Sequence, residues 1–309
     1  MRGTLTAALI LLTALGASAD AAQPKKPVQA AIARIPAKIL FGKARAPSNL
    51  PPQSIGGYAD GCLAGGNALP LTDPAKLPAW QVMRPSRNRN WGNPELIDFL
   101  ERFARAARES GDWPGLLVGD LAQPRGGPML TGHASHQIGL DADIWLTPMP
   151  AHVLTPRERE TMSPRKVVKS HFDIDTGVWT DSHAKLISRA AKDKNVARIF
   201  VHPPIKKALC EWAGTTGDRA WLAKVRPYYG HDYHFHVRLR CPAGNTACKN
   251  QPEPQPADGT GCGAELKGWL SKDFWARRQP APPGKPIKPA PALTLAALPA
   301  ACKTVLASP

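Results

Sequence analysis

One segment of the chain, GHASHQIGLDADIW from Gly132 to Trp145, limits the possible folds more than any other. From Leu140 to Leu146 its apolar and polar residues alternate, which is the pattern of a strand with one buried face. Asp141 and Asp143 share the polar face. Gly139 comes just before, where the backbone must turn or approach another segment closely. We therefore expect a strand that carries two carboxylates and is entered from a glycine turn.

A second segment, GHDYHFHVRLR from Gly230 to Arg240, has the same period of two. Its apolar residues occupy odd positions and therefore one face of the expected strand. The polar residues occupy even positions and the other face: His234, His236, Arg238 and Arg240. Two histidines at positions i and i+2 of a strand point to the same side, so His234 and His236 can reach a common centre. His231 lies just upstream, in the expected turn that enters the strand.

Together the two segments predict a metal site. His136, Asp143 and His236 form a set of three nitrogen and oxygen ligands. Such sets bind catalytic Zn²⁺ and leave the fourth tetrahedral position to water. His234 is beside the metal without being needed as a ligand, so it and His231 are the candidates for proton transfer.

Other polar residues near these segments have several candidate roles. Asp141 is expected to orient a ligand histidine by accepting its second N–H. His133 is a further ligand, a donor to the ligands or a substrate contact, and the pattern leaves these roles open. The arginines of the second segment and its approach are candidates for bidentate binding of substrate carboxylates: Arg226, Arg238 and Arg240. Arg240 also has a structural explanation, because it adjoins Cys241.

The arrangement H-x(6)-D followed by H-x-H resembles the clan of zinc peptidases that act on peptidoglycan. The fuller pattern, HASHQxGLDxDI with VRP-x(3)-H-x(2)-H-x-HVRLRCPA, is similar to the penicillin-insensitive murein endopeptidases in particular. The resemblance runs from Ser54 to Trp269, and the cysteines extend it to Cys302. It implies Zn²⁺-dependent hydrolysis of the D-alanyl–meso-diaminopimelyl cross-link, without a serine nucleophile and therefore insensitive to β-lactams. It also implies that His133 lies close to the metal and that His234 acts as the base.

Three other functions compete with this one. The first is a zinc D,D-carboxypeptidase or dipeptidase of the same clan, and the second is a non-catalytic cell-wall binding protein. The third is a serine hydrolase that uses Ser135, but the chain has no G-x-S-x-G elbow there and the H-x-H strand would be unexplained. A looser cluster of possible metal ligands consists of His171, Asp173 and Asp175. A second metal site is one interpretation, but a polar surface loop explains the cluster more simply.

Residues 1–19 have the features of a cleavable secretion signal, namely an early arginine, a short apolar run and small residues before the cleavage point. The apolar run is too short to cross a bilayer. We therefore expect export to the periplasm without stable membrane insertion. Residues 20–53, rich in proline and lysine, predict an extended lead-in, and residues 275–309 predict a proline-rich tail. Residues 54–274 are expected to form a single metallopeptidase domain.

Six cysteines in an exported chain predict disulfides. The sequence by itself allows fifteen complete pairings. Cys241 and Cys248 are close enough to close a small loop together. For the others, the family resemblance implies Cys62–Cys302 and Cys210–Cys262, so that Cys302 ties the tail to the front of the domain. A cysteine metal site is disfavoured, because the chain has no C-x-x-C pair.

The charge balance points to an anionic partner. The formal net charge is +16, from 40 lysines and arginines against 24 acidic residues. Such a surplus favours polyanions. Export argues against nucleic acid, whereas peptidoglycan stems carry free carboxylates. A contribution to solubility alone is the alternative.

The remaining patterns predict an α+β fold with a small, largely antiparallel sheet and flanking helices. A helix is expected to begin at Asn93-Pro94-Glu95, where asparagine caps the first turn, and to end at Gly111. Its apolar stripe marks it as part of the core. Further helices are expected at residues 180–192 and 204–212, and short strands at 116–118 and 199–201. The zinc site would lie between the loop that leads into the first strand and the H-x-H strand.

Overall fold

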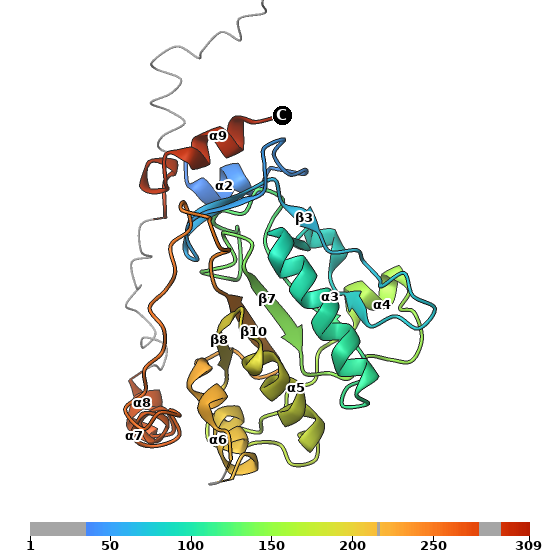
Figure 1. Ribbon diagram of the computed structural model, residues 1–309, viewed down its shortest axis with the longest axis vertical. Coiled ribbons are helices and arrows are strands. Elements are labelled where there is room, and N and C mark those ends of the chain that lie inside the picture. Colours follow the sequence, from blue (N-terminus) through green and yellow to red (C-terminus); the bar gives the residue numbers. More distant parts are fainter. Residues whose placement is uncertain (1–34, 215–216, 278–291) are drawn as a thin grey trace, which may run out of the picture.

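The computed structural model describes residues 35–214, 217–277 and 292–309, so the expected signal segment lies outside the described residues. A six-stranded sheet forms its centre (Figure 1). In spatial order the strands are Trp80–Val82 (β4), Leu116–Val118 (β6), Asp141–Trp145 (β7), His234–Leu239 (β10), Val196–Val201 (β8) and Val225–Pro227 (β9). The three inner pairings are antiparallel and the two outer ones are parallel. This confirms the expected α+β fold with a largely antiparallel sheet.

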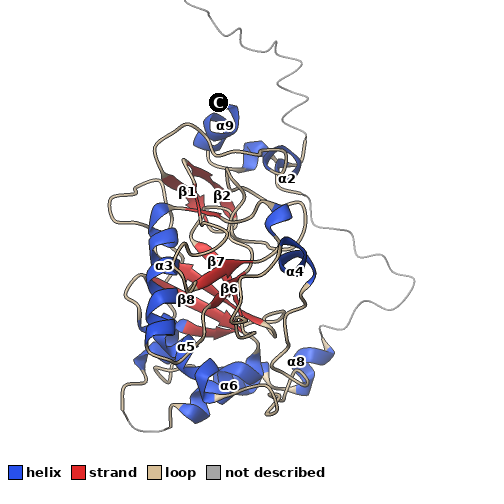
Figure 2. Ribbon diagram, turned by 90° about the vertical axis from the view of Figure 1, so that its right-hand side faces the viewer, coloured by secondary structure: helices blue, strands red, loops and turns tan. Residues whose placement is uncertain are grey.

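Helices pack against the apolar face of the sheet. Their bounds are Pro94–Glu109 (α3), Asp181–Lys192 (α5) and Pro203–Trp212 (α6). Asn93 caps α3 as expected, with its side chain accepting a hydrogen bond from the Glu95 backbone N–H. The apolar stripe of α3 is buried in one cluster with Ile144 of β7 and Phe235 of β10. Figure 2 shows α3 and α5 along the same side of the strands. Because one face is covered, the polar side chains of β7 and β10 are confined to the other.

A smaller unit lies at the end of the molecule where the first and last helices of the described residues pack (Figure 1). It consists of the helices Ala37–Phe41 (α2) and Ala301–Ala307 (α9) and the hairpin Gln53–Gly57 (β1) with Asp60–Ala64 (β2). We expected no packed element before Ser54, but Ala37 and Phe41 are fully buried. They share an apolar cluster with Cys302 and Val305 of α9. Composition alone did not reveal this packing, because each end is covered by the other.

All six cysteines are paired, and the structure has no free cysteine among the residues it describes. The disulfides are Cys62–Cys302, Cys210–Cys262 and Cys241–Cys248. These are the pairings that the family resemblance and the short spacing implied. The first joins β2 to α9 across 240 residues of sequence, so it holds the C-terminal helix against the front of the domain.

Shorter elements complete the structure. They are Asn67–Ala68 (β3), Pro85–Arg87 (η1), Trp91–Gly92 (β5), Pro156–Thr161 (α4), Ala220–Lys224 (η2), Ala264–Trp269 (α7), Lys272–Ala276 (α8) and Leu295–Ala297 (η3). Among the helices of the described ranges, none has both the length and the apolarity that crossing a membrane requires.

Candidate metal centre

The pairing of β7 with β10 brings the two sequence segments together. Asp143 lies directly opposite His236, and Asp141 lies directly opposite Arg238. Facing residues of an antiparallel pair point to the same side of the sheet, so all four side chains share the face that the helices leave uncovered. A shift of the pairing by one residue would turn the polar side chains of one strand into the core. The register is therefore as important to the site as the residues themselves.

His136 reaches this face from the loop before β7. Its backbone is in the left-handed region, with φ of 64°, which is uncommon for a residue other than glycine. The backbone N–H donates to Oδ2 of Asp141 at 3.0 Å, which holds the turn in place. The side chain is fully buried, and its Nε2 lies 3.4 Å from Oδ1 of Asp143. Strain of this kind is typical of functional sites, where the surrounding contacts sustain it.

Four imidazole rings surround the carboxylate of Asp143. Its Oδ1 lies 3.4 Å from His136 Nε2 and 3.4 Å from His236 Nδ1. The same oxygen is 3.6 Å from His234 Nε2, and Oδ2 is 3.5 Å from His133 Nδ1. A tetrahedral zinc ion with bonds of about 2.0–2.1 Å keeps its ligand atoms roughly 3.3–3.4 Å apart. The distances from Asp143 to His136 and His236 match that separation.

Buried atoms at this point have no hydrogen-bonding partner. Among the described residues, these unpaired buried atoms include both ring nitrogens of His136 and Oδ1 of Asp143. Each such atom costs about 1–3 kcal/mol of folding free energy if nothing compensates it. His133, His136 and Asp143 each offer one ligand atom, and these atoms lie within 4.8 Å of one another. A cation bound between them would satisfy Oδ1 of Asp143 and one ring nitrogen of His136, so the residues fit a divalent metal.

Asp141 lies behind the ligands and connects them. Its Oδ1 accepts from His236 Nε2 at 2.8 Å and from Arg238 Nε at 2.8 Å. Burial alone would raise the pKa of Asp141, but the charges of Arg238 and His236 outweigh burial and hold it well below its usual range. The carboxylate therefore stays ionised. Because it occupies Nε2 of His236, Nδ1 is the ring nitrogen left to face Asp143.

The charge states of the two facing residues suit metal binding. Burial would raise the pKa of Asp143, but the surrounding histidines outweigh it and keep the pKa well below its ordinary value. Burial lowers the pKa of His236 to about 4. At neutral pH the site thus presents an anionic carboxylate and a neutral imidazole, the forms in which these groups bind metals.

His133 adjoins the same carboxylate from the edge of the site. Its Nε2 contacts Oδ2 of Asp120 at 3.0 Å, so Nδ1 is the atom that faces Asp143. Burial acts to lower the pKa of His133, but Asp143 and Asp120 outweigh it and raise the pKa. Sequence reasoning did not find Asp120. The available signal was its position two residues after the apolar strand at residues 116–118.

His231 and His234, the predicted acid/base pair, lie next to each other, with ring centroids 5.0 Å apart. His234 is buried on the site face of β10. Nδ1 of His231 contacts the carbonyl oxygen of Tyr229 at 2.8 Å, which leaves Nε2 unengaged by that bond. Burial, followed by the charges of neighbouring histidines, lowers the pKa of His231 to about 3, and burial also lowers the pKa of His234. Both rings are therefore neutral near pH 7.

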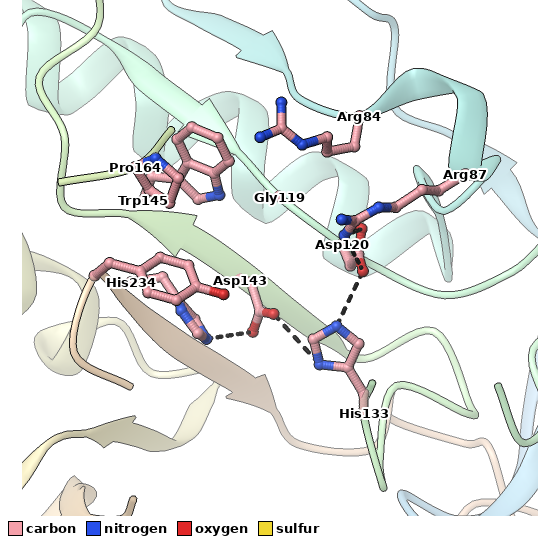
Figure 3. Close-up of a pocket in the computed structure, with 10 residues that line it drawn as sticks. Arg84, Arg87, Gly119, Asp120, His133, Asp143, Trp145, Pro164 and His234 are labelled. Atoms are coloured by element: carbon pink, nitrogen blue, oxygen red, sulfur yellow. Dashed lines mark hydrogen bonds and ion pairs between the residues drawn. The ribbon is translucent and has the colours of Figure 1, made fainter. Parts of the chain in front are cut away.

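A pocket opens beside His234 and Asp143 (Figure 3). The rest of its lining includes Arg84, Arg87, Trp145 and Tyr233. Sequence reasoning did not select these residues. The spacing of Arg84, Arg87 and Arg89 in a loop was a usable signal, but nothing local tied that loop to the histidine segments.

The arginines that sequence reasoning did select are engaged elsewhere. Arg238 is buried against Asp141 and lies 4.1 Å from the ring of Tyr58. Arg226 pairs with Glu265, and Arg240 pairs with Glu253. None of the three lines the pocket. These ion pairs give each arginine a structural role, and they do not support the expected role in binding substrate carboxylates.

The looser cluster at residues 171–175 does not form a metal site in the described part of the chain. His171 instead stacks on Trp275 at 3.7 Å, and its Nδ1 contacts His202 Nε2 at 3.1 Å. The side chain of Asp173 contacts Ser170, within its own turn.

Comparison with known proteins agrees with this geometry. The family model described as penicillin-insensitive murein endopeptidase matches residues 54–307, which include the whole centre and its pocket. A penicillin-insensitive murein endopeptidase of Haemophilus influenzae is 48% identical over 216 residues, or 70% of this chain and 72% of the relative. Proteins of the same name from Yersinia enterocolitica and Klebsiella pneumoniae are 42% and 40% identical, each over 82% of this chain and 86% of the relative. The chain therefore belongs to the family of penicillin-insensitive murein endopeptidases.

Proposed function

We propose that this protein is a zinc-dependent murein endopeptidase that hydrolyses D-alanyl–meso-diaminopimelyl cross-links between peptide stems of peptidoglycan. The observation that carries the proposal is the convergence of His136, Asp143 and His236, where buried ligand atoms have no hydrogen-bonding partner among the described residues. The murein substrate is supported by the family, whose members compared above are all named as murein endopeptidases.

Zinc is the proposed metal because a set of imidazole and carboxylate ligands suits it. His136, Asp143 and His236 would hold the ion, and His133 would add its Nδ1 or lie beside it. Bound Zn²⁺ supplies Lewis-acid chemistry, acidifying water and polarising a carbonyl group. Asp141 would contribute by fixing the orientation of His236.

His234 and His231 are the proposed acid/base residues. Each ring is neutral near pH 7, so each can accept the proton that the attacking water loses. The imidazolium formed in this way can return the proton to the nitrogen of the leaving amine. For His231 the exchanging atom is Nε2, because Nδ1 is bonded to a backbone carbonyl. The reaction involves no serine nucleophile, and we therefore expect β-lactams that acylate serine to leave it unaffected.

We also propose that the protein works in the periplasm, with peptidoglycan rather than nucleic acid or a membrane as its partner. Three disulfides support an oxidising compartment. The signal at residues 1–19 and the metallopeptidase domain at 54–274, to which α2 and α9 add a packed unit, are parts of this proposal. The net charge of +16 is consistent with a substrate that carries carboxylates.

Mass spectrometry of products from defined cross-linked muropeptide dimers tests the function. An endopeptidase converts dimers to monomers, and a chelator stops it until zinc is restored. A D,D-carboxypeptidase shortens stem ends and leaves the cross-link intact, while a binding protein changes nothing. Dimers that survive the zinc-loaded protein would refute the proposal.

Substitutions separate the roles within the site. His236→Ala is expected to lose both bound zinc and dimer cleavage. His234→Ala is expected to keep its zinc and to lower kcat by roughly 10²–10⁴-fold. His152→Ala is the matched control, because that side chain is exposed and pairs only with Glu158 among the described residues. Undiminished cleavage by His236→Ala would contradict the assignment of the metal ligands.

A further inference from the structure

One wall of the pocket beside His234 has an excess of positive charge. Figure 3 shows Arg84 and Arg87 on this wall, across from Asp143 and His234. The only carboxylate among the pocket-lining residues of this wall is Asp120. Asp120 is contacted by Arg87, Arg89 and His133. One negative charge thus faces several cationic groups.

Arg84 and Arg89 are already committed to protein acceptors. Arg89 Nη1 contacts Asp120 at 2.8 Å, and its Nη2 donates to the carbonyl of Thr131. Arg84 donates to the carbonyls of Arg159 and Met162, each at 2.7 Å. These bonds explain the positions of both side chains and leave them little freedom to meet a ligand.

Arg87 differs from its two neighbours. Its side chain is 49% exposed, and among the described residues only Nη1 is hydrogen-bonded, to Asp120 at 3.2 Å. A guanidinium group has five N–H donors, so most of those of Arg87 are available. Arg89 contacts Asp120 more closely, at 2.8 Å against 3.2 Å for Arg87, so Asp120 is already neutralised and the charge of Arg87 is largely uncompensated.

The backbone around Arg87 is held firmly. The residues that flank its short helix, Arg84 and Asn88, are both left-handed, with φ of 56° and 53°. Arg84 N–H bonds the carbonyl of Arg159, and Asn88 accepts from Trp91 Nε1 at 2.7 Å. Between them, Ser86 donates twice to the carboxylate of Glu160. A cationic side chain is thus presented from a fixed base, the arrangement that favours specific binding.

We propose that Arg87 binds the free carboxylate on the substrate carbon that carries the leaving amine. This inference rests on the proposed function. His234 and the candidate ligand Asp143 line the same pocket as Arg87. Under the proposed function, in which His234 returns the proton to the leaving nitrogen, the residue on the leaving side of the scissile bond is placed there. In the D-alanyl–meso-diaminopimelyl cross-link, that residue carries a carboxylate next to the amide nitrogen. Arg87 is the cation within the pocket with donors to meet it.

The consequence is selectivity for the charge state of the cross-link. A dimer whose carboxylate is converted to a carboxamide loses the ion pair with Arg87 but keeps every other contact. Loss of a charge-assisted hydrogen bond is expected to lower kcat/KM by roughly 10–100-fold. We expect the unmodified enzyme to prefer the free carboxylate by a factor in that range.

The test compares kcat/KM for the two dimers in the zinc-loaded protein and its variants. In Arg87→Gln the preference for the free carboxylate should collapse to about twofold or less, through loss of cleavage of the carboxylate dimer alone. Arg87→Lys should keep part of the preference, because it keeps the charge. Arg157→Gln, which removes an exposed arginine from α4, should keep all of it. The ratio is measured within each variant, so partial unfolding does not distort it.

The outcomes separate the two proposals. If the unmodified enzyme cleaves neither dimer, the proposed function fails and the subsite fails with it. If it cleaves both equally well, or if Arg87→Gln lowers both rates by the same factor, the subsite is refuted and the endopeptidase activity stands. A selective loss on the carboxylate dimer supports both.

Discussion

Replacing Asp141 with asparagine would separate two functions of one buried carboxylate. The substitution keeps the shape of the side chain and removes its charge. At present the carboxylate accepts hydrogen bonds from His136 N–H, His236 Nε2 and Arg238 Nε. An amide has one acceptor oxygen and brings two donors of its own, so it cannot serve all three groups. We expect separate losses of stability and of metal affinity.

The two losses have different physical origins. Arg238 is only 7% exposed, and among the described residues Asp141 is its one acidic partner. Removing one member of a buried ion pair costs about 3–5 kcal/mol of folding free energy, because the other charge stays buried without compensation. Independently, the loss of the group that orients a ligand histidine lowers metal affinity by about 10–100-fold.

A double variant distinguishes these origins. Arg238→Met removes the uncompensated charge and keeps the contact with Tyr58, so Asp141→Asn/Arg238→Met should recover most of the stability. Its affinity for zinc should remain as low as that of Asp141→Asn. Urea denaturation of the metal-free proteins measures the first quantity, and competition with a chromophoric chelator measures the second.

Two results would contradict this reasoning. If the double variant were as unstable as Asp141→Asn, the uncompensated charge of Arg238 would not be the cause of the instability. If Asp141→Asn bound zinc as tightly as the unmodified protein, the contact with His236 would not orient the ligand.

Two further predictions concern stability away from the metal centre. Burial lowers the pKa of Lys206 to about 7, and Nζ donates to the carbonyls of Leu222 and Thr260. An unfolded lysine titrates near 10.4, so between pH 7 and 9 the unfolded chain binds more protons and the free energy of unfolding rises with pH. The rise should be about 1–3 kcal/mol larger in the unmodified protein than in Lys206→Met, measured by urea denaturation at each pH; equal slopes would exclude the effect. Replacing Cys62 and Cys302 with serine should cost about 2–5 kcal/mol of stability and leave zinc stoichiometry unchanged, as followed by thermal denaturation and metal analysis; unchanged stability would show that the apolar cluster suffices to hold α9.

Much of the fold was predictable from local patterns. The alternation around Asp143 and around His236 predicted both strands and the face on which each side chain lies. The cap at Asn93 predicted where α3 begins. These features depend on residues close together in sequence, and each agrees with the structure. The candidate ligands on the strands, Asp143 and His236, follow from the same alternation, because a strand with period two places side chains of one parity on one side.

The packing of the two chain ends was not predictable in this way. Residues 37–41 lie in a stretch rich in proline and lysine, which predicts an unpacked lead-in. Phe41 is nevertheless buried, because α9 returns to cover it from the other end of the chain. A short apolar stretch shows nothing of a partner that lies more than 250 residues away.

The arginine side chains separate what the sequence determined from what the tertiary structure decided. The sequence by itself determined which side chains can share a face, since the geometry of a strand is a property of its own backbone. Only the tertiary structure decided which charges are neutralised, because the register of β7 against β10 pairs Arg238 with Asp141, while a distant loop delivers Arg87 to the pocket. An ion pair depends on distance in space rather than on position along the chain. For this reason Arg238 is buried against a carboxylate, whereas Arg87 is half exposed in the pocket.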